Sequence, residues 1–289
     1  MQIPKKVWKR YSDGLAKVSD EAKALIIRYI ETHDIEGEEG RDALIRYAYG
    51  ISTKYGEAAA AYACQMYDAI TELEGSTAPP AEPAETATYS ETAKAVNGTL
   101  KYALAAEMVG TAVGRLVKMA GQDTTLKNAI RDKAYFAWIP SGDTCVYCLM
   151  IAAEGWQRAS ASALDGGHAE HIHGNCNCSY AIRHDSDTSY ASYDPSEYQD
   201  IMDGAEGKTE TDKLNYLRRQ NYAENKDEIN EQKRMTYRAR VLAEEDADEI
   251  NVNYAPSGAF LVHIGDPPPL SEGLGYLTPQ VKEGGKNGN

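Results

Sequence analysis

Apolar positions in the N-terminal quarter of the chain recur at three and four residues, which is the period of an amphipathic helix. The first such pattern covers residues 4 to 32, where Ser19 and two following acidic residues form a candidate internal N-cap that would divide the segment into two helices. The second pattern predicts a long helix with a sustained apolar stripe. Its positions are Leu44, Ala48, Ile51, Tyr55, Ala59, Tyr62, Met66, Ile70 and Leu73. Another helix has to cover this stripe, either in a bundle core within this chain or at a seam with a neighbouring subunit.

The pattern then changes to a polar, proline-containing segment and back to a helical period. Residues 75 to 90 hold three prolines and little to bury, which predicts a surface linker with polyproline character. Residues 100 to 120 predict a further amphipathic helix that contains Gly110 and Gly114. Each interior glycine costs about 1 kcal/mol relative to alanine, so these positions indicate close helix contact or a break. A shorter helix is expected from 125 to 136.

Four of the five cysteines follow this helical region, between residues 145 and 178. A Cys-x-x-Cys pair lets one tight turn direct two sulfurs at a single tetrahedral zinc ion, and a second cluster downstream completes the ligand set. The candidate ligands, five for four places, are Cys145, Cys148, His173, Cys176 and Cys178. The predicted cofactor is therefore a structural Zn²⁺ ion. The alternatives are thiols packed in a loop and a disulfide pair.

Charge and hydropathy limit the other classes of protein. The N-terminus has no apolar region typical of a signal peptide, so we expect thiols in a reducing cytosol rather than disulfides. No apolar run approaches the ~18 residues of a membrane span, and the mean hydropathy is -0.54, so no membrane contact is expected. The formal net charge of -14 means that any contact with DNA has to be local.

Known catalytic motifs are approached but not matched. The run from His168 through Glu170 to His171 has too short a spacing for the zinc-protease motif H-E-x-x-H. A deaminase motif would need its histidine before the cysteine pair, and here the order is reversed. His168 and His171 can also be spare ligands or groups that orient the ligands. A zinc ion with four protein ligands is closed to substrate, so the pattern favours a structural role over catalysis.

The C-terminal part is locally basic. Residues 213 to 240 hold eight basic residues against four acidic ones, which favours a solvated helix with i,i+4 ion pairs over a DNA-binding segment. Residues 251 to 264 predict a hairpin, and the segment from 266 onward predicts a mobile tail.

These patterns together predict a mainly α fold. It has a helical N-terminal region, a small zinc-stapled α/β module, which includes a helix at 149 to 153 and a strand at 179 to 183, and a helical, partly disordered C-terminal tail. The expected divisions of the chain are 1–74 (N-terminal helices), 75–90 (linker), 91–139 (second helical segment), 140–185 (metal-binding module), 186–265 (helical and hairpin extension) and 266–289 (flexible tail).

Three segments resemble the minor head protein family of tailed phages related to the phage Mu F protein, and in particular its capsid-like branch from phages and prophages of Gram-positive hosts. They are residues 120–132, the Cys-x-x-Cys turn within 140–150, and the closing element within 168–178. Gly174 stands where the family usually has proline, and Asn177 where it usually has arginine. Neither departure touches a candidate ligand.

The resemblance implies a virion protein that is present in few copies, contacts the portal and major capsid proteins, and acts in head morphogenesis or DNA delivery after assembly in the host cytoplasm. Self-association through the helices and a local DNA contact by residues 213–240 are further expectations. Two other functions stay open at this point. One is a metal-dependent nuclease of the treble-clef type with His168 or His171 as general base, and the other is a capsid maturation protease, a label that some relatives have.

Overall fold

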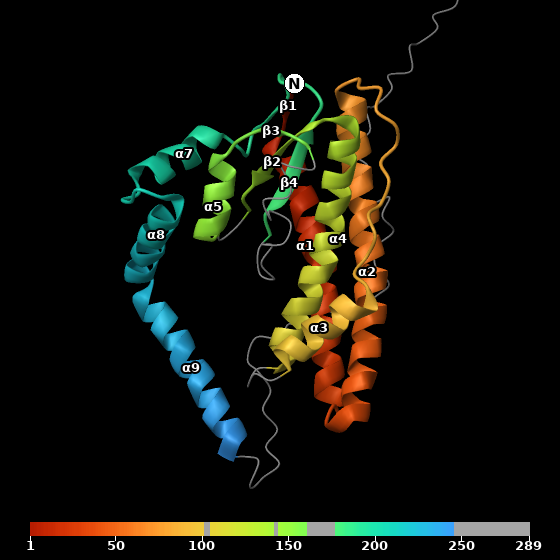
Figure 1. Ribbon diagram of the computed structural model, residues 1–289, viewed down its shortest axis with the longest axis vertical. Helices are drawn as coiled ribbons and strands as arrows, with labels where there is room; N and C mark the ends of the chain where they lie inside the picture. Colours follow the sequence, from red (N-terminus) through yellow and green to blue (C-terminus); the bar gives the residue numbers. More distant parts are fainter. Residues whose placement is uncertain (101–104, 142–143, 161–176, 246–289) are drawn as a thin grey trace, which may run out of the picture.

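The computed structural model describes residues 1–100, 105–141, 144–160 and 177–245, and it is mainly helical there (Figure 1). The expected hairpin at 251–264 and the tail from 266 lie outside the described residues. The helices are α1 (Lys5–Thr32), α2 (Gly37–Leu73), α3 (Tyr89–Thr99), α4 (Ala105–Asp132), α5 (Val146–Ala153), α7 (Pro195–Gly204), α8 (Glu210–Glu224) and α9 (Lys226–Glu245). The strands are β1 (Gln2–Ile3), β2 (Tyr135–Ile139), β3 (Gln157–Arg158), β4 (Ser179–Arg183) and β5 (Ser189–Tyr190).

Helices α1, α2 and α4 pack along one another and form the body of the molecule (Figure 1). Seven of the nine predicted stripe positions of α2 are buried: Leu44, Ala48, Tyr55, Ala59, Tyr62, Met66 and Ile70. Helices α1 and α4 of the same chain cover this stripe, which confirms the interpretation as a bundle core. None of the described helices is long and apolar enough to cross a membrane.

Helix α1 is continuous, so the predicted division at Ser19 is wrong. The side chain of Ser19 is buried, and its hydroxyl donates to the carbonyl oxygen of Gly114 on α4 at 2.9 Å. Ser19 therefore links two helices and caps neither. Only the packing of α4 against this position shows the difference, because a serine followed by acidic residues has the same sequence signature in both cases.

Helix α4 is continuous through Gly110 and Gly114, so these glycines mark close contact and not a break. A Cβ atom added at Gly114 would lie 3.0 Å from the hydroxyl oxygen of Ser19, and one at Gly110 would lie 3.0 Å from the carbonyl oxygen of Lys23. Because glycine has no Cβ atom, the backbones of α1 and α4 can approach each other closely along the middle of α1.

The prediction of a separate helix at 125–136 is wrong, because residues 125–132 continue α4 and residues 133–136 are not helical. Helix α4 ends at Asp132 because Lys133 adopts a left-handed conformation, with φ of 53°. The N–H of Ala134 donates to the carbonyl oxygen of Ala129 at 2.9 Å, which is the bond of a Schellman motif. Glycine is the usual residue at that position, so the lysine gave no stop signal. Residues 135–139 form β2 instead.

The segment 75–88, here called the strap, has no helix or strand and runs back along the helical body, beside α2 in Figure 1, with hydrogen bonds to α4. The amide of Asn128 makes two hydrogen bonds with the backbone of Glu82, at 2.8 and 2.9 Å, and the hydroxyl of Thr124 accepts from the N–H of Ala84 at 2.9 Å. Arg131 donates to the carbonyl oxygens of Pro79 and Pro80. A linker that looked unattached in the sequence is thus held on the helical body.

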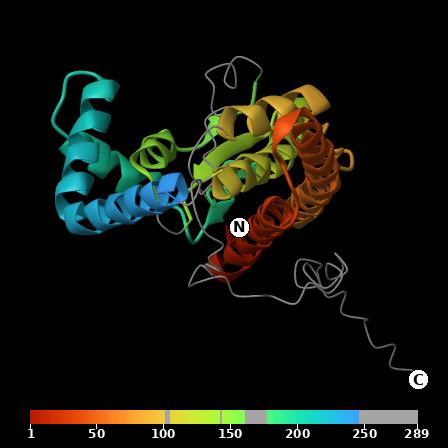
Figure 2. The same cartoon turned by 90° about the horizontal axis from the view of Figure 1, so that it is seen from below.

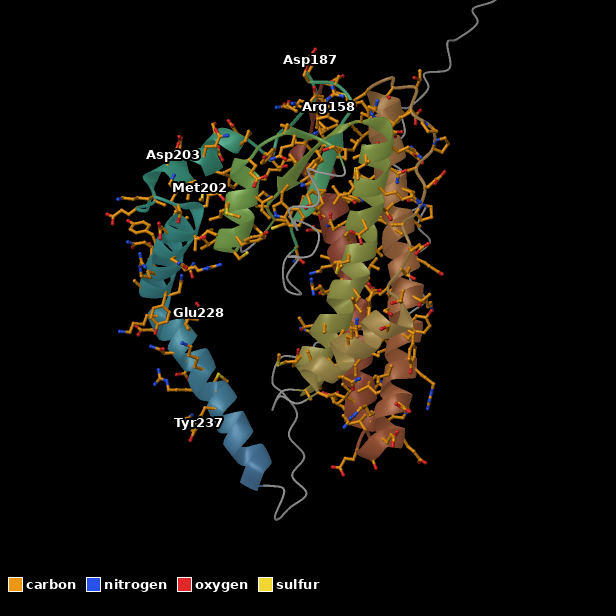
Figure 3. All side chains as sticks on the ribbon, in the orientation of Figure 1. Arg158, Asp187, Met202, Asp203, Glu228 and Tyr237 are labelled. Atoms are coloured by element: carbon orange, nitrogen blue, oxygen red, sulfur yellow. The ribbon has the colours of Figure 1, made fainter. Side chains whose placement is uncertain are left out.

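Helices α7, α8 and α9 form an arm. Helices α7 and α8 contact α5, with α8 on the side away from the bundle, and α9 continues from α8 and runs back below α5 (Figures 1 and 2). Capping residues define its helices: Asp194 accepts from the N–H of Ser196, and Thr209 and Asp212 form a capping box. The prediction of helix within 213–240 is confirmed, with an interruption at Asn225. The side chains of Glu228 and Tyr237 project outward from α9 (Figure 3), and that of Tyr237 is 66 % exposed.

We expect Gly114→Leu to lower the free energy of unfolding by about 1–3 kcal/mol, since the larger side chain meets α1 in a packed contact. The matched control is Gly50→Leu on α2, where an added Cβ meets nothing within 4 Å. The control should be neutral or stabilising by up to about 1 kcal/mol through helix propensity. Thermal unfolding followed by far-ultraviolet circular dichroism compares the two. Equal effects would contradict the close approach of α1 and α4.

Candidate metal centre

One end of the three-stranded sheet brings together two segments that are far apart in the sequence. Strand β2 lies between β3 and β4, and its pairing with β4 is antiparallel with Ile139 opposite Ser179. The chain that leaves β2 therefore lies beside the chain that enters β4. The backbone N–H of Ser141 donates to the sulfur of Cys178 at 3.4 Å across this end.

Helix α5 supplies the Cys-x-x-Cys pair at the same end of the sheet. Cys145 is the N-cap of α5, and its carbonyl oxygen accepts from the N–H of Leu149 at 3.1 Å. Cys148 lies in the first turn and is buried, as is Cys178. The predicted short apolar helix is confirmed, and it packs against β2 because its residues are almost all apolar. All three cysteines belong to or contact one hydrophobic cluster.

The structure thus places three of the five predicted ligands, Cys145, Cys148 and Cys178, on neighbouring elements. His173 and Cys176 lie outside the described residues, as do His168 and His171. Within the described ranges, no group of three or more His, Cys, Asp or Glu side chains is arranged to hold a metal ion. The zinc site stays a prediction. Thiols are ligands that zinc takes, and the N–H of Ser141 at the sulfur of Cys178 is a contact that a metal-bound thiolate can also accept.

Gln122 on α4 is a residue of this centre that the sequence did not reveal. Its side-chain amide donates to the carbonyl oxygen of Cys178 at 3.4 Å and to the hydroxyl of Ser179 at 3.2 Å. Its side-chain oxygen accepts from the N–H of Tyr180 at 3.0 Å. Strand β4 is at the edge of its sheet, so this buried glutamine satisfies backbone groups that β2 does not reach.

Lys118, one turn before Gln122, contacts the same segment. It is only 7 % exposed, and its ammonium group donates to the side-chain oxygen of Asn177 at 3.2 Å. The sequence signal for both residues is weak but real: a lysine and a glutamine four residues apart interrupt an otherwise apolar and small-residue face of α4.

Aromatic side chains line the interior of the sheet behind the cysteines. The ring of Tyr180 is fully buried, with its centroid 4.6 Å from that of Trp138 and 5.7 Å from that of Phe136. Burial raises the pKa of Tyr180 well above its ordinary value, so its hydroxyl stays neutral. The sheet end is therefore an apolar environment in which polar groups depend on Gln122 and Lys118.

The other end of β4 is fixed by a second polar network. The N–H of His184 donates to the carboxylate of Glu74 at 2.6 Å, and the ring Nε2 of His184 lies 2.8 Å from the hydroxyl oxygen of Thr71. Tyr67 donates to Asp132 at 2.8 Å, and Arg131 binds the same carboxylate. Burial opposes ionisation of Asp132, but the hydrogen bonds from Arg131 and Tyr67 hold its pKa below the ordinary value. Both ends of β4 are thus tied to the helical body.

The basic residues of the arm lie on α8 and α9. Their side chains are mostly exposed, and Arg218 and Arg219 line a shallow surface depression with Asn215 and Tyr222. In the part of the arm that the structure describes, Arg234 pairs with Glu231 three residues away and Lys213 pairs with Asp203 of α7. The DNA contact of residues 213–240 stays a prediction.

The fold and the site define a helical protein that has a cysteine-bearing sheet end attached to a long three-helix body. The chain belongs to the VG15 protein family, whose family model matches residues 2–205. This is a family of viral gene proteins, which indicates a phage-encoded protein. The match includes the cysteine pattern and ends at the end of α7. No match is found among curated proteins or among solved structures.

We expect Gln122→Leu to lower the free energy of unfolding by about 2 kcal/mol or more, because it leaves buried groups of residues 178–180 without a hydrogen-bond partner. Hydrogen exchange at the Tyr180 amide should become faster. Gln199→Leu is the control, since the exposed Gln199 also donates to one backbone carbonyl, that of Ala153. Water can replace that bond, so its effect should be within about 0.5 kcal/mol. Unchanged exchange at Tyr180 would contradict the role of Gln122.

Proposed function

We propose that this phage protein is a minor head protein with a structural zinc centre, and that it acts in head morphogenesis or DNA delivery next to the portal. The resemblance to the Mu F-like family supports the role in the head. The observation that supports the proposal is the placement of Cys145, Cys148 and Cys178 on neighbouring elements, at one end of a small sheet that is fixed to a long helical body.

The proposed ligands are drawn from Cys145, Cys148 and Cys178 together with His173 and Cys176, which lie outside the described residues. A zinc ion bound there would supply folding free energy and no reaction chemistry. The sheet is small, since β2 and β3 pair over two residue pairs only, and its buried side chains share the core of the helical body. A bound zinc ion would add a link between α5 and the segment that enters β4. Ser141 and Gln122 hold Cys178 by its sulfur and its carbonyl oxygen.

The helical body supports the proposed docking on portal and capsid proteins. Helix α2 has 37 residues and is therefore about 55 Å long. Because α1 and α4 cover its apolar stripe, the surfaces left for partners, including further copies of this chain, are the outer faces of the helices and the exposed arm. Docking surfaces of this extent suit a component that joins larger parts of an assembly.

Purified protein should contain about one zinc ion per chain, and Cys148→Ser or Cys178→Ser should abolish it. Loss of the metal should also make residues 140–185 sensitive to protease. Elemental analysis and limited proteolysis measure the two effects.

Cys64→Ser on α2 is the matched control. Burial raises the pKa of the Cys64 thiol to about 11, with Asp68 adding to the effect, so this thiol stays protonated at neutral pH. The control should keep its full zinc content. Protein prepared under reducing conditions that holds no zinc would overturn the metal centre.

In phage particles, the protein should co-purify with the portal and the major capsid protein, at a copy number far below that of the latter. Deletion of the gene should give malformed or poorly infectious heads. Quantitative mass spectrometry of purified particles and plaque assays measure these outcomes.

Replacement of His168 and His171 together by alanine tests the structural role against an enzymatic one. Head morphogenesis should continue, because neither histidine is a catalytic base in this proposal. If the double variant stays folded and zinc-loaded but heads no longer mature, an enzymatic function takes the place of the structural one.

A further inference from the structure

The outer helix of the arm, α8, has one solvent-exposed face that carries two arginines side by side. A shallow surface depression on this face is lined by Asn215, Arg218, Arg219 and Tyr222, and all four residues are exposed. Their positions, i, i+3, i+4 and i+7, place them on one side of the helix. The buried residue of α8 is Leu214, which is not part of this set. Helix α8 therefore packs through another face and leaves the arginines to solvent.

Helix α9 adds a third positive charge at the edge of the depression. The ammonium nitrogen of Lys233 lies 5.2 Å from the centre of the Tyr222 ring, which is a cation–π contact. The hydroxyl of Tyr222 in turn donates to the side-chain oxygen of Asn230 at 3.4 Å. Residues from both helices thus meet around one aromatic ring, and three cations surround the depression.

These three cations lack the ion pairs that the basic sequence pattern predicts. Two other cations of the arm, Lys213 and Arg234, are paired with carboxylates. Among the residues that the structure describes, Arg218, Arg219 and Lys233 form no ion pair. A solvated helix with internal ion pairs therefore does not account for this face of the arm.

The polar groups beside the two arginines are neutral or already engaged. Arg218 donates to the side-chain oxygen of Asn215 at 3.3 Å. The carboxylate of Asp212 lies within electrostatic reach of Arg219, but it accepts from the N–H of Thr209 in the capping box at 3.1 Å. The depression therefore presents uncompensated positive charge to solvent, which is the property of an anion-binding surface.

We propose that this surface of the arm binds the phosphate backbone of double-stranded DNA without reading its sequence. The planar guanidinium groups of Arg218 and Arg219 match phosphate oxygens in bidentate hydrogen bonds, and Lys233 adds a point charge. Asparagine and tyrosine side chains, as at Asn215 and Tyr222, are further common donors to phosphate. A duplex carries one negative charge per ~1.7 Å of its axis, so neighbouring phosphates reach all three cations together.

The acidic character of the whole chain does not oppose such a contact. The formal net charge is -14, but residues 213–240 hold eight basic residues against four acidic ones. Helix α8 lies on the side of α5 away from the bundle (Figure 1). Charges on a protein surface that are more than about 10 Å apart are largely screened at about 0.1 M salt. The arm therefore contacts DNA while the acidic body stays apart from it.

The biological setting of this contact rests on the function proposed above, because a protein next to the portal lies where the genome passes. The contact itself rests on the charges of the arm and does not involve the zinc centre. The two claims fail separately. Absence of the protein from phage heads would contradict the proposed function, whereas loss of DNA binding by the purified chain would contradict the role of the arm.

Fluorescence anisotropy of the full chain with a labelled duplex of about 20 base pairs, over a series of salt concentrations, measures the contact. The dissociation constant should rise steeply with salt, and two duplexes of unrelated sequence should bind alike. Arg218→Gln together with Arg219→Gln should weaken binding by about 10- to 100-fold near 0.1 M salt, because two phosphate contacts are lost. The slope of log Kd against log salt should fall by about 2. Replacement of both arginines by lysine keeps the charges and should keep the slope.

Lys213→Gln together with Arg234→Gln is the matched control. It also removes two positive charges from the arm, but both of these belong to ion pairs, with Asp203 and Glu231. Its affinity should stay within a few-fold of the wild type, with an unchanged slope. Far-ultraviolet circular dichroism checks the helix content of each variant. If the double arginine variant loses helix, the two single glutamine variants replace it, each with a slope change of about 1.

Three results would overturn the proposal. The first is a wild-type chain that does not bind duplex DNA even at low salt. The second is an equal loss of affinity in the arginine variant and in the control, which would reduce the contact to the overall charge of the arm. The third is competition by polyglutamate as strong as that by unlabelled duplex, which would assign the surface to an acidic protein partner.

Discussion

Packing around helix α4 is the constraint on which the rest of the structure depends. The residues of α4 that face α1 and α2 have to be small, since a Cβ atom at Gly121 would lie 3.3 Å from the carbonyl oxygen of Ala59. The residues of α4 that face the strap have to be polar, because Asn128 and Thr124 accept hydrogen bonds from backbone groups that belong to no helix or sheet. Toward the sheet Gln122 does the same for β4. One helix therefore fixes the body, the strap and the cysteine-bearing end together.

This arrangement has a consequence for the proposed metal centre. Strand β4 is attached to the helical body at its beginning by Gln122 and at its end by Glu74, which accepts from the N–H of His184. A segment held at both ends brings Cys178 to a defined place before any metal binds. In the proposed centre, zinc binding would then cost less ordering entropy than binding to a free loop.

The sequence predicted the parts of the fold that depend on local periodicity. The long stripe of α2, the short helix α5 and the strand at Ser179–Arg183 all follow from the spacing of apolar residues. Errors arose where a residue acts outside its usual role. Ser19 binds a carbonyl on another helix, and Lys133 ends α4 in a conformation that usually needs glycine.

The candidate site divides in the same way. The cysteines could be recognised as candidate ligands because their spacing is local, and three of them lie on neighbouring elements; their role as ligands stays a prediction. Gln122 and Lys118 were missed because their partners are more than fifty residues away in the sequence.

X-ray absorption at the zinc edge of the intact chain tests the central claim, the zinc centre, most directly. The account predicts a tetrahedral shell in which sulfur at about 2.3 Å predominates. A shell of oxygen and nitrogen alone would contradict it.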